Sequence, residues 1–276
     1  MKRACVIGWP VEHSRSPLIH EFWLRAYGIE GAYEKQGVPP EAAEDFIRNL
    51  ASHGFVGGNV TVPHKEVAYR AASRLDEVAQ TVGAVNTLWI DSGELYATNT
   101  DVHGFIHNLD HQAPDWDKSG LPALVLGAGG AARSIVYGLI SRGFPQIRIV
   151  NRTRERADKL AASFGGKVDV YNWDRLSEAA SGCGVLVNTT TQGMKGSGAI
   201  EIDLSALASS AVVNDIVYVP LETELLQRAR QAGLRVADGL GMLLHQAAPA
   251  FQKWFGVYPE VSPELRAHIV ADLDKH

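Results

Sequence analysis

The chain has 276 residues, a formal net charge of −5 and a pI near 6.1, with 46% hydrophobic and 21% charged residues. These values are typical of a globular protein with one large or two ordinary domains, and without a basic surface nucleic acid is not an expected partner. The amino-terminal apolar run is too short for a signal peptide, and no apolar run reaches the ~18 residues of a membrane span. Cys5 and Cys183 lie in apolar surroundings without metal-ligand spacing, which fits a reducing cytosol. We therefore expect a cytoplasmic protein with no membrane contact.

The amino-terminal part alternates strand-like and helix-like segments. Residues 4–8 and 58–62 are short apolar runs bounded by glycine or proline, which predicts strands, and residues 41–54 have helical periodicity. Residues 86–90 and 94–99, separated by Asp-Ser-Gly, predict a hairpin. Parallel and antiparallel strands together indicate a mixed sheet.

The stretch GGNVTVPHK, residues 57–65, places two glycines before a short β-branched strand that Pro63 ends. Thr61 and Lys65 would then lie near the carboxyl end of a strand, where open α/β sheets bind their ligands. Taken alone, Lys65 also fits a solvated lysine that begins a helix.

Residues 111–122 are polar, with two prolines and a glycine, and predict a linker into a new unit. A repeated strand–helix pattern follows and predicts a doubly wound parallel sheet. Its expected strands are 123–127, 147–151, 184–190 and 211–218, with a helix over about 130–142. The apolar tail from about 240 is helical, and periodicity leaves open whether it closes this unit or returns to the first.

The segment VLGAGGAAR fits the dinucleotide-binding pattern G-x-G-x-x-A through Gly127, Gly129 and Ala132. The match follows a predicted strand and opens a predicted helix, as the mechanism requires: the glycines admit a tight turn and the pyrophosphate, and the helix N-terminus supplies free N–H groups. A glycine-rich turn without a ligand is the alternative.

The end of the next strand distinguishes the two nicotinamide cofactors. NAD-binding folds place an acidic residue there for the ribose 2′-hydroxyl, whereas this chain reads NRTRER from Asn151 to Arg156. Guanidinium groups suit a 2′-phosphate, so the sequence predicts NADP.

Further polar motifs follow several expected strands: GWPVEHSRSP (8–17), NVTVPHK (59–65), GAVNT (83–87), NTDVHGF (99–105) and DGLGMLLHQA (238–247). Hydroxyls, amides and one lysine–aspartate pair suit a small polyol that carries a carboxylate. With these motifs, the glycine-rich turn, NRT and NTTTQGM, the chain resembles the shikimate dehydrogenase family over nearly its whole length.

This resemblance implies reversible NADP-linked reduction of 3-dehydroshikimate to shikimate, in the pathway to chorismate and aromatic amino acids. It also implies a substrate-binding domain formed by residues 1–102 plus 240–276, and an inserted Rossmann NADP-binding domain, residues 103–239. The fold expected is thus α/β with two domains, the first a mixed sheet completed by the carboxyl-terminal helix.

The resemblance assigns roles residue by residue. Lys65 and Asp101 would be the catalytic acid/base pair. The substrate would bind Ser14 and Ser16 through its carboxylate, and Thr61, Lys65, Asn86, Asp101 and Gln246 through its hydroxyls, with Tyr218 reaching it from the Rossmann side. The cofactor residues would be Gly127, Ala128, Gly129, Gly130, Ala131, Asn151, Arg152, Thr153, Arg154, Arg156, Ile216 and Gly239, with Glu77 as a weaker candidate.

Some alternatives remain open at this level. The chain could be a quinate/shikimate dehydrogenase that uses NAD(P), an amino-shikimate dehydrogenase, or a non-catalytic sensor that binds NADP or shikimate, although a sensor should have lost Lys65 or Asp101. No metal site is expected, because His13, His20 and His64 fit no familiar ligand spacing and are interpreted as loop or helix-cap residues. The chain could be a monomer or a homodimer. Glu21 stands where the family pattern has asparagine.

Overall fold

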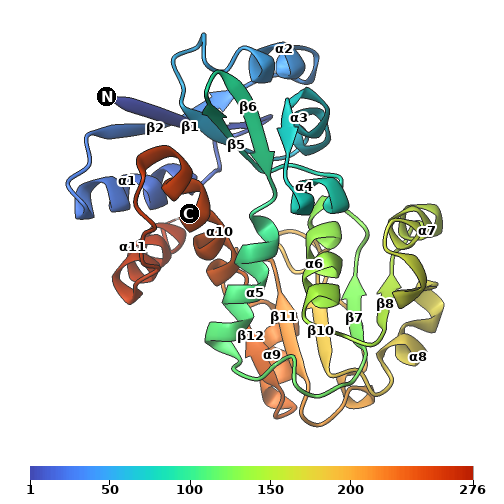
Figure 1. Cartoon of the computed structure of the whole chain (residues 1–276). Coiled ribbons are helices and arrows are strands. Elements are labelled where there is room, and N and C mark those ends of the chain that lie inside the picture. The colour runs from blue at the N-terminus through green and yellow to red at the C-terminus, as the bar shows by residue number, and fades with distance from the viewer. Residues whose placement is uncertain (276) are drawn as a thin grey trace. The chain divides into compact units, whose positions relative to one another are not determined.

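A computed structural model, which describes residues 1–275, contains two β-sheets, each in its own part of the chain (Figure 1). The first unit consists of Met1–Asp101 and the segment from Leu244 onward, and the second consists of Val102–Leu243. The sequence divided the chain at 102/103 and 239/240. Which unit binds substrate and which binds NADP stays a prediction.

The first unit has a mixed sheet, as predicted. Its strands lie in the order β2 (Gly31–Gly37), β1 (Lys2–Gly8), β3 (Gly57–Val60), β5 (Thr87–Asp91), β6 (Glu94–Thr98) and β4 (Arg74–Leu75). Strand β1 runs parallel to β2 and β3, β3 pairs antiparallel with β5, and β5 and β6 form the predicted hairpin. Strand β3 ends at Val60, so Thr61 and Val62 follow the strand instead of belonging to it as predicted.

Helices complete the first unit. They are α1 (Ser16–Ala26), the 3-10 turn η1 (Pro40–Ala42), α2 (Ala43–Arg48), α3 (Lys65–Ala71), α4 (Glu77–Val82), α10 (Leu240–Phe255) and α11 (Pro263–Leu273). The single helix expected over 41–54 is thus shorter, with one 3-10 turn before α2.

Of the two glycines of β3, Gly57 makes room for a helix and Gly58 for the neighbouring strand β1. A Cβ atom on Gly57 would stand 2.2 Å from Nε1 of Trp254 and 2.3 Å from the Leu88 carbonyl oxygen, and one on Gly58 would stand 2.9 Å from the Cys5 carbonyl oxygen. Trp254, near the end of α10, donates its indole N–H to that Leu88 oxygen at 2.8 Å. The carboxyl-terminal part of α10 therefore packs on the sheet of the first unit, which answers the question that periodicity left open.

The second unit has the predicted doubly wound sheet, and all its pairings are parallel. Its strands lie in the order β12 (Arg235–Ala237), β11 (Val212–Asp215), β10 (Val185–Asn188), β7 (Ala123–Leu126), β8 (Ile147–Val150) and β9 (Val168–Tyr171). The chain order reverses between β7 and β10, which is where such sheets bind ligands at their carboxyl edge.

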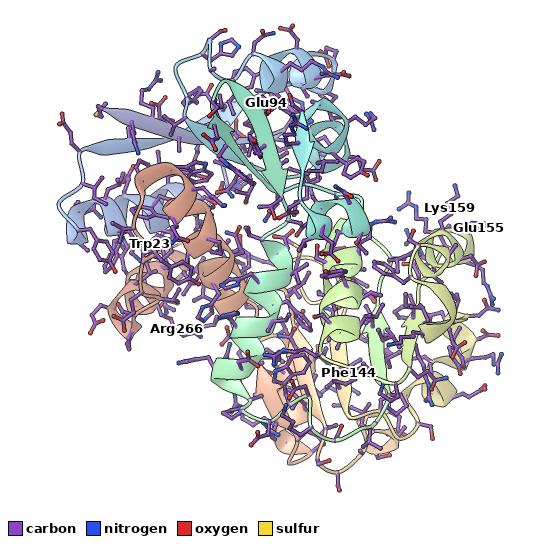
Figure 2. The ribbon with its side chains drawn as sticks, viewed as in Figure 1. Trp23, Glu94, Phe144, Glu155, Lys159 and Arg266 are labelled. Atoms are coloured by element: carbon purple, nitrogen blue, oxygen red, sulfur yellow. The ribbon has the colours of Figure 1, made fainter. Side chains whose placement is uncertain are left out.

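Alternate residues of these strands face two separate hydrophobic cores. Val125 and Val187 belong to one core, together with Phe144 (labelled in Figure 2), while Leu124 and Leu186 belong to the other. Both faces are covered, as parallel sheets require. The helical elements of this unit are α5 (Asp101–Gln112), α6 (Gly130–Ser141), α7 (Arg154–Ala162), η2 (Gly165–Lys167), η3 (Trp173–Arg175), α8 (Leu176–Ala180), η4 (Leu204–Ala206) and α9 (Glu224–Gln231).

Within the described residues, none of these helices combines the length and apolar character that a bilayer crossing needs.

Candidate active site

Lys65 and Asp101 form the charged centre of the first unit. Lys65 is the first residue of α3 and Asp101 the first of α5, so both follow turns at strand ends. The Lys65 Nζ atom forms a short ion pair with Asp101 Oδ2, and the two side chains are only 20% and 11% exposed. The structure thus brings together the two groups that the sequence paired, in a place where a charge interaction is weakly screened.

Asn86 and Gln246 join this pair. Asn86 Nδ2 donates to Asp101 Oδ1 at 2.8 Å and to Gln246 Oε1 at 3.3 Å. As whole residues, all three are less than a tenth exposed. Four of the predicted substrate residues therefore form one hydrogen-bonded group that contains a cation, a carboxylate and two amides.

Of the remaining predicted substrate residues of the first unit, Ser14 and Thr61 lie on the loops after β1 and β3, and Ser16 is the first residue of α1. Ser14 Oγ accepts the Ser16 backbone N–H at 3.3 Å, and the Thr61 N–H donates to the Ile7 carbonyl oxygen at 2.9 Å. Ser16 lies beside Tyr33. Burial raises the pKa of Tyr33, and an interaction with the Ser16 side chain opposes that shift.

The three histidines take different places from one another. His64 occupies the N-cap position of α3, as predicted, but its side chain does not cap the helix, and its Nε2 lies 2.6 Å from the Val38 carbonyl oxygen. For His20 the prediction of a loop or helix-cap residue is wrong, because the residue lies within α1, fully buried, with its ring stacked on Tyr33 at 4.1 Å. The aromatic rings around His20 come from segments far apart in the sequence, so the spacing of the histidines could not predict this position. Among the described residues, no cluster of three or more acidic, histidine or cysteine side chains could hold a metal.

In the second unit, the glycine-rich turn between β7 and α6 has the properties of a phosphate cradle. Gly127 has φ +106°, and a Cβ atom there would stand 2.5 Å from Thr189 Oγ1, so this position needs glycine for the fold itself. A Cβ on Gly129 or Gly130 would meet nothing within 4 Å. Their lack of a side chain is thus not required by packing, and it leaves open space in front of the N-terminus of α6, which no side chain caps.

The segment Asn151–Arg156 runs from the end of β8 into the first turn of α7. Thr153 occupies the N-cap position of α7 without a side-chain cap, and Asn151 Nδ2 donates to the Thr153 carbonyl oxygen at 2.7 Å. Arg154 is paired with Asp158, at 3.3 Å, whereas in the described part of the chain no carboxylate pairs with Arg152 or Arg156. Two cationic side chains next to an uncapped helix N-terminus suit a phosphate.

The loop after β11 is fixed by a buried carboxylate. Asp215 accepts hydrogen bonds from Asn188 Nδ2 at 2.8 Å, from the Thr223 hydroxyl at 2.8 Å and from the Val217 N–H at 3.0 Å. Burial raises the pKa of Asp215, and these hydrogen bonds oppose the shift. This contact gives Asn188, at the end of β10, a structural role.

Ile216 and Tyr218 follow on that loop and are half-buried. A Cβ atom on Gly239 would stand 2.3 Å from the Ile216 carbonyl oxygen, so Gly239 is required by this close approach. Glu77 is the exposed first residue of α4 in the first unit, and the cofactor residues predicted with it, at 127–131, 151–156, 216 and 239, belong to the second unit.

Two residues of the site were not singled out from the sequence. The Thr87 hydroxyl can donate to Asn86 Oδ1 at 3.0 Å, and the Thr100 backbone N–H donates to the same oxygen at 2.7 Å. Both residues belong to polar motifs, Thr87 to GAVNT and Thr100 to NTD. The motifs therefore marked this part of the site, but did not show which of their residues hold Asn86.

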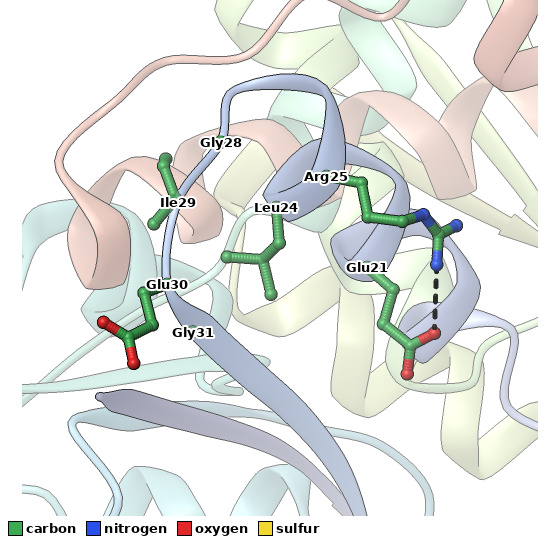
Figure 3. Close-up of a pocket in the computed structure, with 7 residues that line it drawn as sticks. All are labelled: Glu21, Leu24, Arg25, Gly28, Ile29, Glu30 and Gly31. Carbon is green, nitrogen blue, oxygen red and sulfur yellow. Dashed lines mark ion pairs between the residues drawn. The ribbon is translucent and has the colours of Figure 1, made fainter.

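A surface hollow of the first unit lies apart from these residues (Figure 3). It is lined by the end of α1 and the start of β2, and Glu21, the residue that departs from the family pattern, pairs there with Arg25 at 3.9 Å. None of the predicted site residues lines it. The departure at Glu21 therefore concerns this hollow and leaves the predicted site unchanged.

Comparison with known families matches three segments. Residues 6–88 match the family described as "Shikimate dehydrogenase substrate binding domain". Residues 111–196 match "Shikimate / quinate 5-dehydrogenase", and residues 239–263 match "Shikimate 5'-dehydrogenase C-terminal domain".

Full-length relatives and solved structures agree. A "Shikimate dehydrogenase (NADP(+))" of Nitrobacter hamburgensis is 56% identical over 272 residues, 99% of this chain and 95% of the relative, and that of Brucella abortus is 53% identical over 277 residues, 99% and 96%. A shikimate 5-dehydrogenase from Thermus thermophilus, solved with NADP(H) and shikimate, has a TM-score of 0.84 at 36% identity, covering 98% of this chain and 100% of that one. A quinate dehydrogenase from Corynebacterium glutamicum, solved with NAD, has a TM-score of 0.90 at 28% identity, covering 98% and 99%. On the strength of these full-length identities, this chain belongs to the shikimate dehydrogenase family.

Proposed function

We propose that this protein is an NADP-dependent shikimate dehydrogenase, which catalyses the reversible reduction of 3-dehydroshikimate to shikimate. The observation that carries this function is the Lys65–Asp101 ion pair, held by Asn86 within a family whose named relatives catalyse this reaction. An ammonium group, a carboxylate and amides in one largely buried cluster suit a hydroxylated substrate. The oxygen bound to the reacting ring carbon of such a substrate gains a proton when the carbonyl is reduced and loses it when the hydroxyl is oxidised.

Lys65 would exchange that proton. Hydride addition to a carbonyl carbon leaves negative charge on the oxygen, and a positioned donor lowers the barrier to it. In reduction Lys65 Nζ gives the proton to the oxygen, and in oxidation Lys65 receives it from the substrate hydroxyl. Asp101 holds the Lys65 ammonium in place and accepts a hydrogen bond from the substrate.

The other contacts orient the ring. Ser14 and Ser16 offer hydroxyls and a helix N-terminus, at the start of α1, to the substrate carboxylate. Thr61, Asn86 and Gln246 would bind its hydroxyls, and Tyr218 would also contact the substrate. Each bond to a substrate hydroxyl discriminates against analogues that lack it, because the buried polar group would be left unpaired.

The second unit fits NADP. The open space at Gly129 and Gly130, before the uncapped N-terminus of α6, would accept the pyrophosphate, and Arg152 with Arg156 would meet the 2′-phosphate. When bound, the nicotinamide supplies or accepts the hydride. Asn151, Thr153 and Arg154 would hold the adenosine end, while Ile216 and Gly239 would lie near the nicotinamide.

The test is an initial-rate assay at the nicotinamide absorbance band, with shikimate or quinate crossed against NADP or NAD. We expect strong turnover only with shikimate and NADP. Comparable rates with quinate or NAD would instead favour a quinate/shikimate dehydrogenase. The structural similarity to the quinate dehydrogenase solved with NAD supports that alternative. No turnover by a folded protein that binds NADP would support a sensor.

The cofactor assignment has its own test. Arg152→Ala should weaken the binding of NADP much more than the binding of NAD, because only NADP carries the 2′-phosphate. Arg175→Ala, which removes an exposed arginine paired with Glu178 elsewhere in the same unit, serves as the control. Equal weakening of both cofactors by Arg152→Ala would contradict a 2′-phosphate contact.

A further inference from the structure

A line of buried polar side chains in the first unit leads to Asp101. None of the side chains before Asp101 is more than 5% exposed. The Tyr33 hydroxyl lies 2.6 Å from Asn59 Oδ1, Asn59 Nδ2 lies 3.2 Å from Thr87 Oγ1, Thr87 Oγ1 lies 3.0 Å from Asn86 Oδ1, and Asn86 Nδ2 lies 2.8 Å from Asp101 Oδ1.

The orientation of the Asn86 amide is set by its neighbours. Its Oδ1 faces the Thr100 backbone N–H at 2.7 Å, which can only donate. Its Nδ2 faces the Asp101 carboxylate and Gln246 Oε1, which accept. The opposite orientation would set oxygen against oxygen and N–H against N–H, so the amide presents its NH₂ group to Asp101.

Asn59 is oriented in the same way. Its Nδ2 lies 3.2 Å from the Asn86 backbone carbonyl oxygen, which can only accept, so its Oδ1 must face Tyr33. The Tyr33 hydroxyl therefore donates to Asn59. Asn59 in turn donates to the Thr87 hydroxyl. The single proton of that hydroxyl goes to Asn86 Oδ1 at 3.0 Å or to the Thr100 hydroxyl at 3.1 Å, which itself lies 3.2 Å from Asn86 Oδ1.

By either route, directly or through the Thr100 hydroxyl, the chain of hydrogen bonds donates from Tyr33 towards the carboxylate that pairs with Lys65. Hydrogen bonds in such a chain polarise one another, so a donor far from a negative charge still helps to stabilise it. Thr87 is the link on which the direction depends, because its hydroxyl accepts from Asn59 and can donate towards Asn86, directly or through the Thr100 hydroxyl.

We infer that Thr87 is a positioning residue for the dehydrogenase reaction: its hydroxyl, together with the Thr100 backbone N–H, holds the Asn86 amide, which donates to the Asp101 carboxylate and keeps it aimed at Lys65. The inference rests on the proposed function. It adds a residue that neither touches the substrate in the assigned roles nor carries charge.

Thr87→Val and Thr87→Ser test it, after turnover of shikimate with NADP by the unchanged protein has established the function. Valine has the shape of threonine without the hydroxyl, so we expect kcat to fall about tenfold or more while KM changes little. The acid limb of the kcat profile should move to higher pH, since a carboxylate that has lost support from its hydrogen-bond donor holds its negative charge less well. Thr87→Ser should restore both.

The control is Trp23→Phe, which removes a different buried hydrogen bond of the first unit, from the Trp23 indole to the Glu260 carbonyl oxygen at 2.9 Å (Trp23 is labelled in Figure 2). The inference is overturned if Thr87→Val keeps the kcat and pH profile of the unchanged protein, or if Thr87→Ser or Trp23→Phe alters them equally. Thr87→Ala is read in the same way if the valine variant does not fold.

An unchanged protein without turnover would refute the function and not the positioning role. Labelling of Lys65 by acetic anhydride as a function of pH, followed by mass spectrometry, then decides that role. A labelling midpoint that moves in Thr87→Val and stays in Thr87→Ser supports it, and an identical midpoint in both overturns it.

Discussion

At the scale of single residues, Lys65 has neighbours that define its task. It is mostly buried, pairs with Asp101 and begins α3, where it can move little. Lys65→Ala should lower kcat by on the order of 10²–10⁴, the usual contribution of general acid/base catalysis. Turnover assays of this variant and of Lys35→Ala, which removes an exposed lysine of β2, provide the measurement.

Shikimate binding must be followed in parallel, by tryptophan fluorescence. If Lys65→Ala folds, binds shikimate and loses less than tenfold in kcat, Lys65 is not the acid/base. If binding and kcat fall together, Lys65 acts as a binding residue.

The buried histidine His20 should make the stability of the folded protein depend on pH. Burial lowers the pKa of His20 to about 3 in the folded protein, against about 6.5 in an unfolded chain. As pH falls below about 6.5, the unfolded chain binds a proton that the folded protein refuses until about pH 3, so stability declines across that range. From pH 7 to pH 5 this one residue should cost about 2 kcal/mol.

Urea unfolding of the unchanged protein, His20→Phe and His53→Phe at these two pH values measures the effect. Phenylalanine keeps the ring but cannot be protonated, so His20→Phe should lose less stability than the unchanged protein as pH falls. His53, an exposed histidine of the same unit, is the control. Equal pH dependence of all three proteins would contradict a buried neutral His20.

At the scale of elements, local pattern was enough for most of the strands. The parallel strands of the second unit are short apolar runs, and β7, β8, β10 and β11 lie where the sequence placed them, with ends that differ by a few residues. Strands without this signal, such as β2 with sequence GAYEKQG, were not predicted, because their polar residues carry no clear period of two.

The location of α10 could not come from local pattern either. Its apolar residues predict a buried helix equally well in both units, and the deciding contact, from Trp254 to Leu88, joins residues far apart in the sequence. For the same reason the motifs identified Lys65, Asp101 and Asn86, whereas the line of donors through Tyr33 and Thr87 depends on orientations that only the fold defines.

The glycine-rich turn separates a folding requirement from a binding requirement. Gly127→Ala should destabilise the second unit by about 1–3 kcal/mol, because alanine is strained at φ +106° and its Cβ would collide with Thr189. Gly129→Ala should leave stability unchanged, since its Cβ meets nothing within 4 Å, yet weaken NADP at least tenfold. Thermal unfolding and NADP titration of both variants measure this.

A Gly129→Ala variant that binds NADP normally would show that the open space is not the pyrophosphate site. A variant that loses stability as Gly127→Ala does would show that the space is not open. The two glycines thus control for each other.

At the scale of the whole molecule, the second unit interrupts the sequence of the first, yet each unit has its own sheet and core. The first unit, made from both ends of the chain, has its own sheet and holds Lys65, Asp101, Asn86 and Gln246, while the second has its own cores on both faces of its sheet. All the proposed shikimate residues except Tyr218 lie in the first unit, and all the proposed NADP residues except Glu77 lie in the second. Shikimate and NADP should therefore each bind and stabilise mainly one unit.

Hydrogen exchange with one ligand at a time measures this division. Shikimate alone should slow exchange in residues 57–65, 83–101 and 244–248, and NADP alone in residues 127–133 and 151–156, because a ligand suppresses local opening of the groups that it binds. Quinate and NAD at the same concentrations serve as matched controls. NADP protection of α4 would support Glu77 as a cofactor residue in the first unit, and exchange unchanged there would remove it. NADP protection confined to the first unit would contradict the assignment of the glycine-rich turn and Arg152, whatever the turnover assays show.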